Sequence, residues 1–210
     1  MKLLLVAEYR EGEVLGSIAD LLGFAEKVDG EHAMFLVGSD AALPQYGGKL
    51  YLADSTKHGE YSPTVHKELL LEVVGRESPD MIVFSHSSYG WDIAPRVAWA
   101  LKAAQVSEVV DFVDGTLVVP VCNAKLRRDV QVNTEVTVVT LQAGAFGLAE
   151  LPEGSPDVEL VDLDSSAKVE FLGYEEAEAG GVDLSKAEII VSAGRGVGKP
   201  ENIEIVASLA

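Results

Sequence analysis

The chain has 210 residues and a formal net charge of −18. This length suits one large or two small domains, and the acidity argues against binding to nucleic acid phosphates or anionic membrane surfaces. The single cysteine, Cys122, excludes an internal disulfide, and the four histidines lack metal-ligand spacing. The apolar run at residues 3–7 is too short for a membrane span or a signal peptide, so we expect a cytoplasmic protein without membrane insertion.

The first half of the chain alternates strand and helix patterns. Short apolar runs predict buried strands at residues 2–7, 33–37, 50–53 and 81–84. Apolar residues at helical spacing predict helices at residues 14–27, 63–73 and 90–102, the second of them opened by Ser62-Pro63. This alternation predicts an α/β fold of the nucleotide-binding, Rossmann type, with a largely parallel sheet and helices on both faces.

The pattern changes after Val106. Residues 109–113 and 116–121 flank Asp114-Gly115, a residue pair typical of hairpin turns. Residues 125–132 alternate less regularly, and a strongly β-branched run follows at 135–141. We expect an antiparallel β extension here, a meander that includes residues 135–141 and is added to the parallel core.

Residues 143–186 are rich in loop-forming and acidic residues. From Glu150 to Glu178 there are ten acids and one base, which predicts a solvated acidic face or linker, with a docking surface for a basic partner as the alternative. Gly180-Gly181 indicates a hinge or linker. We therefore expect the first domain to cover residues 1–186.

The last segment, 187–210, carries a glycine-rich loop. A short buried strand is predicted at residues 188–192, the loop follows at 193–199, and Pro200 is placed to open a helix. Glycines in such a loop let the backbone approach a phosphate, but Gly-x-Gly-x-Gly alone is a weak signal. Arg195 is either a solvated loop residue or a guanidinium beside a phosphate or an electron-rich ring. The predicted strand either completes the first sheet or, as we expect, opens a second α/β domain that continues beyond Ala210.

Several short segments form an ordered set of motifs, and they are residues 88–98, 107–111, 122–124, Ala145-Phe146, 192–196 and Glu201-Asn202. Together these segments resemble the alpha subunits of electron transfer flavoproteins. The resemblance covers essentially the whole chain and keeps the order of the motifs, which makes it more specific than any one of them. It departs from the family at two places, where Leu117–Pro120 and Gln142 stand in regions that usually contain an arginine.

This resemblance implies an α/β first domain followed by an FAD-binding domain in the same chain. It assigns an FAD contact to Arg195, with Gly194 and Gly196 permitting close approach. The other FAD contacts of the family would lie beyond residue 210, so we expect these 210 residues alone not to retain FAD. The implied task is that of an electron carrier without catalytic chemistry of its own, partnered by a beta subunit, a dehydrogenase donor and an electron acceptor. A stand-alone adenine-nucleotide-binding domain and a protein-interaction domain remain alternatives.

Other side chains have simpler interpretations. Arg96 fits a helix-surface salt bridge or a packing role at a subunit or domain contact, and Cys122 is expected to be a small buried residue. The exposed end of a strand precedes residues 86–88, but a hydrolytic Ser/His site is disfavoured because the sequence lacks a Gly-x-Ser-x-Gly elbow. Trp91 and Trp99 are expected to pack in the core or in an interface.

Overall fold

A computed structural model describes residues 1–167, 169–175 and 189–209 of the chain. The chain divides into two compact units, Met1–Phe171 and Leu172–Ala210. The domain boundary predicted after residue 186 and the predicted hinge at Gly180-Gly181 both lie outside the described residues.

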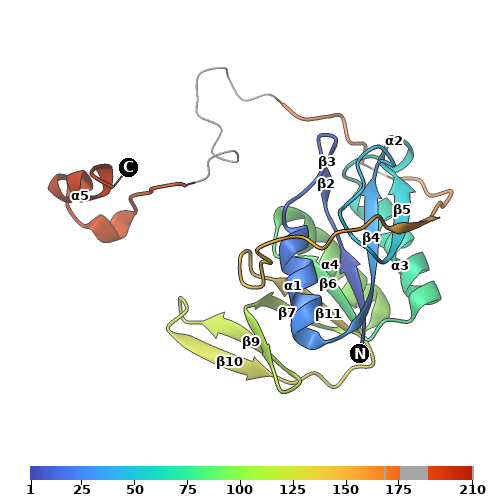
Figure 1. The fold of residues 1–210 in the computed structure, drawn as a ribbon, viewed down its shortest axis with the longest axis horizontal. Coiled ribbons are helices and arrows are strands. Elements are labelled where there is room, and N and C mark those ends of the chain that lie inside the picture. Colours follow the sequence, from blue (N-terminus) through green and yellow to red (C-terminus); the bar gives the residue numbers. More distant parts are fainter. Residues whose placement is uncertain (168, 176–188, 210) are drawn as a thin grey trace. The chain divides into compact units, whose positions relative to one another are not determined.

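The first unit is built on a parallel sheet, which has seven strands in the described part of the chain (Figure 1). Every neighbouring pair of strands in this sheet is parallel. Its strands in spatial order are β12 (Asp157–Leu160), β5 (Lys49–Asp54), β4 (Glu31–Gly38), β1 (Lys2–Val6), β6 (Met81–Ser85), β11 (Thr137–Leu141) and β7 (Ala104–Val109).

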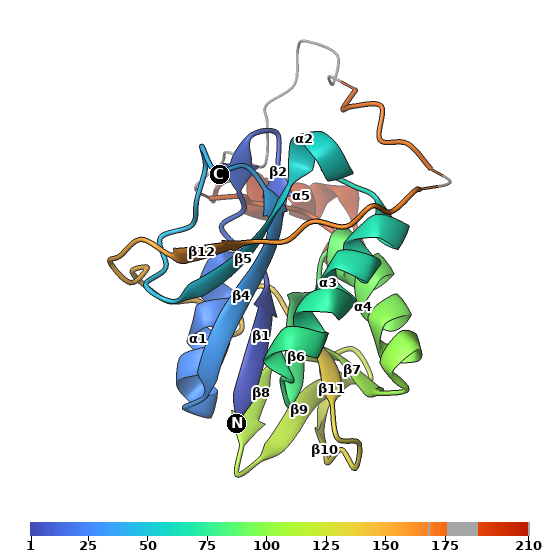
Figure 2. The same cartoon turned by 90° about the vertical axis from the view of Figure 1, so that its right-hand side faces the viewer.

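Helices cover both faces of this sheet, as the sequence predicts (Figure 2). Helix α1 (Ile18–Val28) lies on one face, and α3 (Pro63–Glu77) and α4 (Ser88–Leu101) lie on the other. Successive side chains of a strand point to opposite faces, so β1 sends Leu3 and Leu5 toward α1 while Leu4 and Val6 pack with α3 and α4. The short helix α2 (Ser55–His58) follows β5. None of the helices in the described residues is long and apolar enough to cross a membrane.

The predicted antiparallel extension is confirmed. Strands β8 (Asp111–Val113), β9 (Thr116–Val121) and β10 (Leu126–Val130) pair antiparallel in the order β10-β9-β8. Asp114 and Gly115 form the first turn, with φ angles of 48° and 79°. This combination is the type I′ geometry, whose twist matches that of the flanking strands. The β9–β10 hairpin projects away from the parallel sheet (Figure 1).

The prediction that residues 135–141 belong to the antiparallel meander is wrong. Thr137–Leu141 forms β11, which inserts between β6 and β7 and is parallel to both. All five of its residues are buried. A run with no alternating polar residues is typical of a strand covered on both faces, whereas position in the sequence after a hairpin does not decide which sheet a strand joins.

Two further pairings were not predicted. Strands β2 (Tyr9–Arg10) and β3 (Glu13–Val14) form a hairpin, so α1 begins at Ile18 and not at residue 14. Within the acidic stretch, β12 adds a short parallel strand to the free edge of β5. The sequence Asp-Val-Glu-Leu gave no clear signal because the strand is short and mostly exposed.

The second unit contains short helical turns. These are the 3₁₀ turns η2 (Arg195–Val197) and η3 (Pro200–Asn202), followed by α5 (Ile203–Ala207). The helical segment predicted from Pro200 is therefore confirmed, but the buried strand is wrong for residues 189–192, which form no strand. Ile189 is 82% exposed and Ile190 56% exposed. Among the described residues of this unit no strand is present to pair with them, and an unpaired strand in water is not stable.

Candidate functional site

The three residues predicted to contact FAD lie together in one tight turn. Gly194 precedes η2, and Arg195 and Gly196 form its first two residues. The turn is closed by a hydrogen bond from the Val197 N–H to the Gly194 carbonyl at 3.1 Å, and Gly198 follows with a φ of 79°. That left-handed backbone favours glycine, so the turn itself explains why residue 198 is a glycine.

Other contacts hold this loop against the next turn. The Asn202 side-chain amide donates to the Val197 carbonyl at 2.9 Å, and the Asn202 backbone N–H donates to the Lys199 carbonyl at 3.1 Å. Asn202 thereby ties η3 back to the glycine-rich loop. This contact gives a physical reason for pairing the glycine loop with a downstream asparagine.

Arg195 is exposed and makes no ion pair with any residue that the structure describes. A Cβ added at Gly194 or Gly196 would meet no atom of the described residues within 4 Å. Packing against that part of the chain therefore does not explain the two glycines, and there the backbone on either side of Arg195 is open to approach. An arginine with five N–H donors on an open loop can bind a phosphate or stack on a ring system.

A second polar site lies at the carboxyl edge of the parallel sheet. Strand β1 leads through α1 to β4 on one side, and β6 lies on its other side, so the strand order reverses between β1 and β6. Ligands of open α/β sheets commonly bind at such a switch point. The side chain of Glu8 follows β1 there, is 7% exposed, and accepts a hydrogen bond from Ser87 Oγ at 2.6 Å. Burial raises the pKa of Glu8, although the Ser87 hydrogen bond opposes the shift.

His86 and Ser87 do not show the mutual hydrogen bond expected of a hydrolytic serine and histidine. Ser87 Oγ donates to Glu8 and also accepts the Gly90 N–H at 3.0 Å, which caps α4. His86 Nε2 contacts the Trp91 indole N–H at 2.6 Å. The serine and the imidazole therefore serve different partners.

His66 of α3 and Tyr89 of α4 extend this cluster. His66 is 1% exposed; its Nε2 lies 3.0 Å from the Gly59 carbonyl and its Nδ1 lies 3.1 Å from the Tyr89 hydroxyl. A carbonyl only accepts, so Nε2 carries the proton and Nδ1 accepts from Tyr89. Burial lowers the pKa of His66 to about 4, although the Gly59 hydrogen bond opposes the shift.

The observed contacts and exposure test the predictions for the remaining side chains. Arg96 forms an i,i+4 salt bridge with Asp92 at 2.7 Å, which is the surface role expected for it. Cys122 is exposed, so the prediction of a buried residue is wrong. It lies in the turn between β9 and β10, outside the hydrophobic core clusters, and its backbone φ is positive at 54°. Core packing of the tryptophans is also wrong, since Trp91 is 66% and Trp99 87% exposed.

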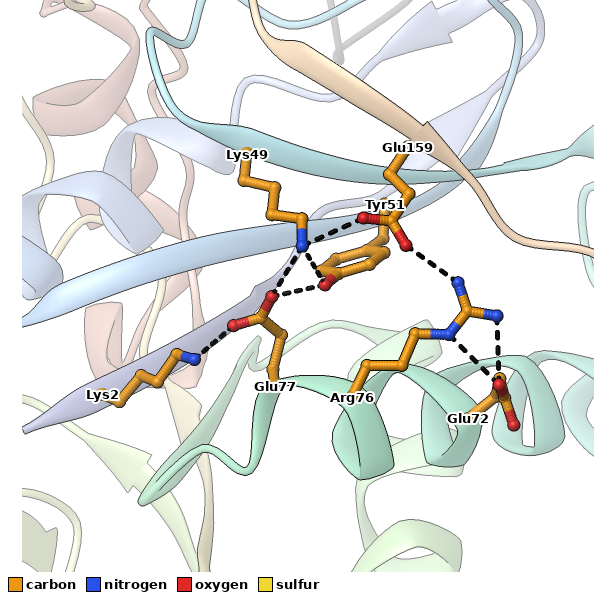
Figure 3. Close-up of polar contacts among 7 residues, drawn as sticks. All are labelled: Lys2, Lys49, Tyr51, Glu72, Arg76, Glu77 and Glu159. Atoms are coloured by element: carbon orange, nitrogen blue, oxygen red, sulfur yellow. Dashed lines mark hydrogen bonds and ion pairs between the residues drawn. The ribbon is translucent and has the colours of Figure 1, made fainter.

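The amino edge of the sheet carries an ion-pair network (Figure 3). Glu77, the last residue of α3, binds Lys2 at 2.5 Å and Lys49 at 3.1 Å. Glu159 of β12 binds Lys49 and Arg76, each at 3.0 Å. Burial disfavours the Glu77 carboxylate, but hydrogen bonds from its partners outweigh burial and lower its pKa to about 2. The members of this amino-edge network are Lys2, Lys49, Tyr51, Glu72, Arg76, Glu77 and Glu159.

Part of the acidic stretch is therefore bound to the fold and is not a freely solvated face. Glu159 pairs as described, and Asp162 binds Lys57 and lies 3.1 Å from His58 Nε2. These acids fasten the segment after residue 156 to the free edge of the sheet. The alternation of acids with Val158 and Leu160 is only a weak signal for this edge strand, because it extends over four residues.

Comparison with known proteins gives a consistent result. A family model described as an electron transfer flavoprotein domain matches residues 3–166. The electron transfer flavoprotein subunit alpha of Bacillus subtilis is 26% identical over 223 residues, which cover 100% of this chain and 69% of the relative. The subunit alpha of Pseudomonas aeruginosa is 26% identical over 219 residues, covering 100% of this chain and 70% of the relative. The subunit alpha of Mycobacterium leprae is 28% identical over 221 residues, covering 99% of this chain and 68% of the relative. The chain therefore belongs to the electron transfer flavoprotein family.

Proposed function

We propose that the chain is an alpha-type electron carrier subunit whose first unit is a scaffold and whose glycine-rich loop contacts FAD. The observation that supports the subunit role most directly is the family match over residues 3–166, together with three relatives named subunit alpha. The observation that favours the FAD contact is Arg195, which is exposed and unpaired among the described residues on a loop with open glycines.

The loop fits one part of FAD and not the whole cofactor. The guanidinium of Arg195 would hold a phosphate or the electron-rich edge of the flavin, and Gly194 and Gly196 would leave room for the cofactor beside the backbone. FAD itself would supply the redox chemistry when bound. One arginine and one loop do not enclose a dinucleotide, so the other contacts would come from a beta subunit and from any polypeptide that follows residue 210 in the reading frame.

The same proposal includes the partners and the absence of catalysis. A beta subunit would complete the assembly, a dehydrogenase would supply electrons and an acceptor would receive them. In this scheme the chain positions the cofactor and makes or breaks no covalent bond. A location in the cytoplasm stays a prediction from the sequence.

The test is FAD retention by the assembled protein. The chain, with any polypeptide that follows it in the reading frame, is co-expressed with its beta partner as wild type, Arg195→Ala and Arg195→Lys. Loss of a charge-assisted contact predicts FAD binding about tenfold or more weaker in Arg195→Ala, measured as flavin absorbance per protein and by titration with FAD. The lysine variant should recover part of the loss if charge matters and little if planar stacking matters.

Lys199→Ala is the matched control, because it removes an exposed cation four positions along the same loop. Equal FAD affinity in wild type and Arg195→Ala would refute the assigned contact. An assembly without flavin, from a chain that binds AMP by itself, would instead support the adenine-nucleotide-binding alternative.

A further inference from the structure

His86 contacts two groups that require different protonation states of its ring. Its Nε2 lies 2.6 Å from the Trp91 indole nitrogen and 3.4 Å from Glu108 Oε1. An indole N–H only donates, and a carboxylate only accepts. Nε2 can therefore accept from Trp91 only when it is bare, and it can donate to Glu108 only when it carries a proton.

The other ring nitrogen fixes the neutral tautomer. His86 Nδ1 lies 2.8 Å from the hydroxyl of Thr140, a residue with no exposed surface. With Nε2 occupied by the indole N–H, the proton of the neutral ring must be on Nδ1, which donates to Thr140 Oγ1. The Thr140 hydroxyl also accepts the Glu108 backbone N–H at 3.2 Å, so β7 helps to position the hydroxyl of β11 that holds the imidazole.

We propose that His86 is the pivot of a pH-dependent switch, in which Trp91 holds the neutral imidazole and Glu108 holds the protonated one. Protonation places an N–H of His86 against the N–H of Trp91, and two donors at this separation repel. The Glu108 carboxylate, already within ion-pair distance, then takes the hydrogen bond and the indole leaves. Nδ1 keeps its bond to Thr140 in both states, so the ring need not rotate.

The surroundings allow the two side chains to exchange. Trp91 is 66% exposed and packs edge-on against His86, with ring centroids 5.2 Å apart. The Glu108 side chain is 54% exposed, while the His86 side chain is only 13% exposed. The movable partners thus lie toward solvent around a fixed ring. The groups that face His86 are Trp91 from α4, Glu108 from β7 and Thr140 from β11, with Glu8 bound to the adjacent Ser87.

The consequence is a change of surface chemistry at the carboxyl edge of the sheet. In the neutral state this position presents an anchored indole beside a free carboxylate. In the protonated state it presents a released indole, the kind of side chain that is enriched in protein interfaces, beside a neutralised ion pair. Recognition at this edge would then depend on pH.

Proton–nitrogen NMR of the whole chain tests the switch, because the two tryptophans give two indole N–H resonances. Trp91→Phe assigns them, and Trp99, 87% exposed on the same helix, is the internal control. On titration from about pH 8 to about pH 5, the Trp91 indole proton should move upfield as its hydrogen bond is lost, and the Trp99 resonance should stay. A Trp91 resonance that is independent of pH would overturn the proposal.

Two variants separate the roles of the partners. In His86→Gln the side-chain oxygen accepts the indole N–H at every pH, so the titration of the Trp91 resonance should disappear. In Glu108→Gln, an exposed change that leaves the core intact, the protonated ring loses a charged partner, so the change in the Trp91 resonance should have its midpoint at lower pH than in the wild type. Titration that persists in His86→Gln, or an unchanged midpoint in Glu108→Gln, would show that the switch does not exist in this form.

Discussion

The buried His66 should make the stability of the first unit depend on pH. Its ring is 1% exposed and held by Gly59 and Tyr89 in the neutral form. Burial lowers its pKa to about 4. An unfolded chain exposes the same ring to water, where imidazole titrates at about 6.5.

The sign and the size follow from these two pKa values. Between about pH 6.5 and about pH 4 the unfolded state binds a proton that the folded state does not bind, so the free energy of unfolding decreases as the pH falls. The difference of roughly 2.5 pKa units corresponds to about 3 kcal/mol. Above about pH 6.5 the full contribution is present, and below about pH 4 no further loss occurs from this residue.

Urea unfolding followed by circular dichroism measures the effect. The wild type and His66→Gln are compared from about pH 7.5 to about pH 4.5, because the variant keeps a polar side chain but cannot titrate. The wild type should lose roughly 2–3 kcal/mol more than the variant over this range. His32→Gln controls for the substitution at a partly buried histidine. An identical pH dependence in wild type and His66→Gln would refute the reasoning.

Four further substitutions test the packing and the charges of the first unit. Gly23→Ala should destabilise the fold by roughly 1–3 kcal/mol or more, because the added Cβ would lie 1.7 Å from the Phe146 carbonyl oxygen. Gly75→Ala is the control, since its Cβ would meet no described atom within 4 Å, and it should be neutral or stabilise the fold by about 0.5–1 kcal/mol. Thermal and urea unfolding measure both effects. Glu77→Gln should cost about 1–2 kcal/mol at pH 7, and its difference from wild type should shrink as pH falls from about 4.5 toward about 2, since the lowered pKa of Glu77 stabilises the fold only above that window. Glu8→Gln should stabilise the fold at pH 7. Burial raises the pKa of Glu8, so the stability that the protonated carboxyl contributes is lost as the pH rises through that pKa. An unfolding curve of the variant that is unchanged at pH 7 but shifted at pH 4 would contradict this prediction.

The parallel core was predictable from the sequence because its signals are strong and local. Leu3 to Val6 and Met81 to Phe84 are short apolar runs, and the Ser62-Pro63 pair marks the start of α3. Asp114-Gly115 predicted its hairpin turn for an equally local reason. In each case the residues themselves restrict the backbone.

The place of β11 was not predictable in the same way. Thr137–Leu141 was identified as a strand, but its insertion between β6 and β7 depends on long-range pairing. Local propensity says that a segment is extended and not which neighbour it joins. Edge strand β12 was missed because three of its four residues are exposed, and its position depends on partners such as Lys49 and Arg76 far away in the sequence.

The candidate sites also differ in whether they depend on neighbouring residues or on long-range contacts. Gly194, Arg195 and Gly196 are contiguous, so the sequence could place them together in one loop. Glu8 and Ser87 are separated by 79 positions in the sequence, and other contacting pairs at the carboxyl edge are separated by dozens of positions. Only the fold brings the members of each pair into contact. A carboxylate directly after a buried strand was the available signal for Glu8. Nothing in the sequence indicated that His86 would meet both Trp91 and Glu108.

Strand β12 also limits self-association of the protein. It covers the outer side of β5, whose Leu50–Ala53 segment is almost entirely apolar, and it is held there by charged contacts of Glu159. An uncovered apolar strand edge is a template for pairing between chains. High salt or acid weakens surface charge pairs before it dissolves an apolar core. Under such conditions self-association should therefore begin by release of this short strand, while the rest of the sheet is still folded.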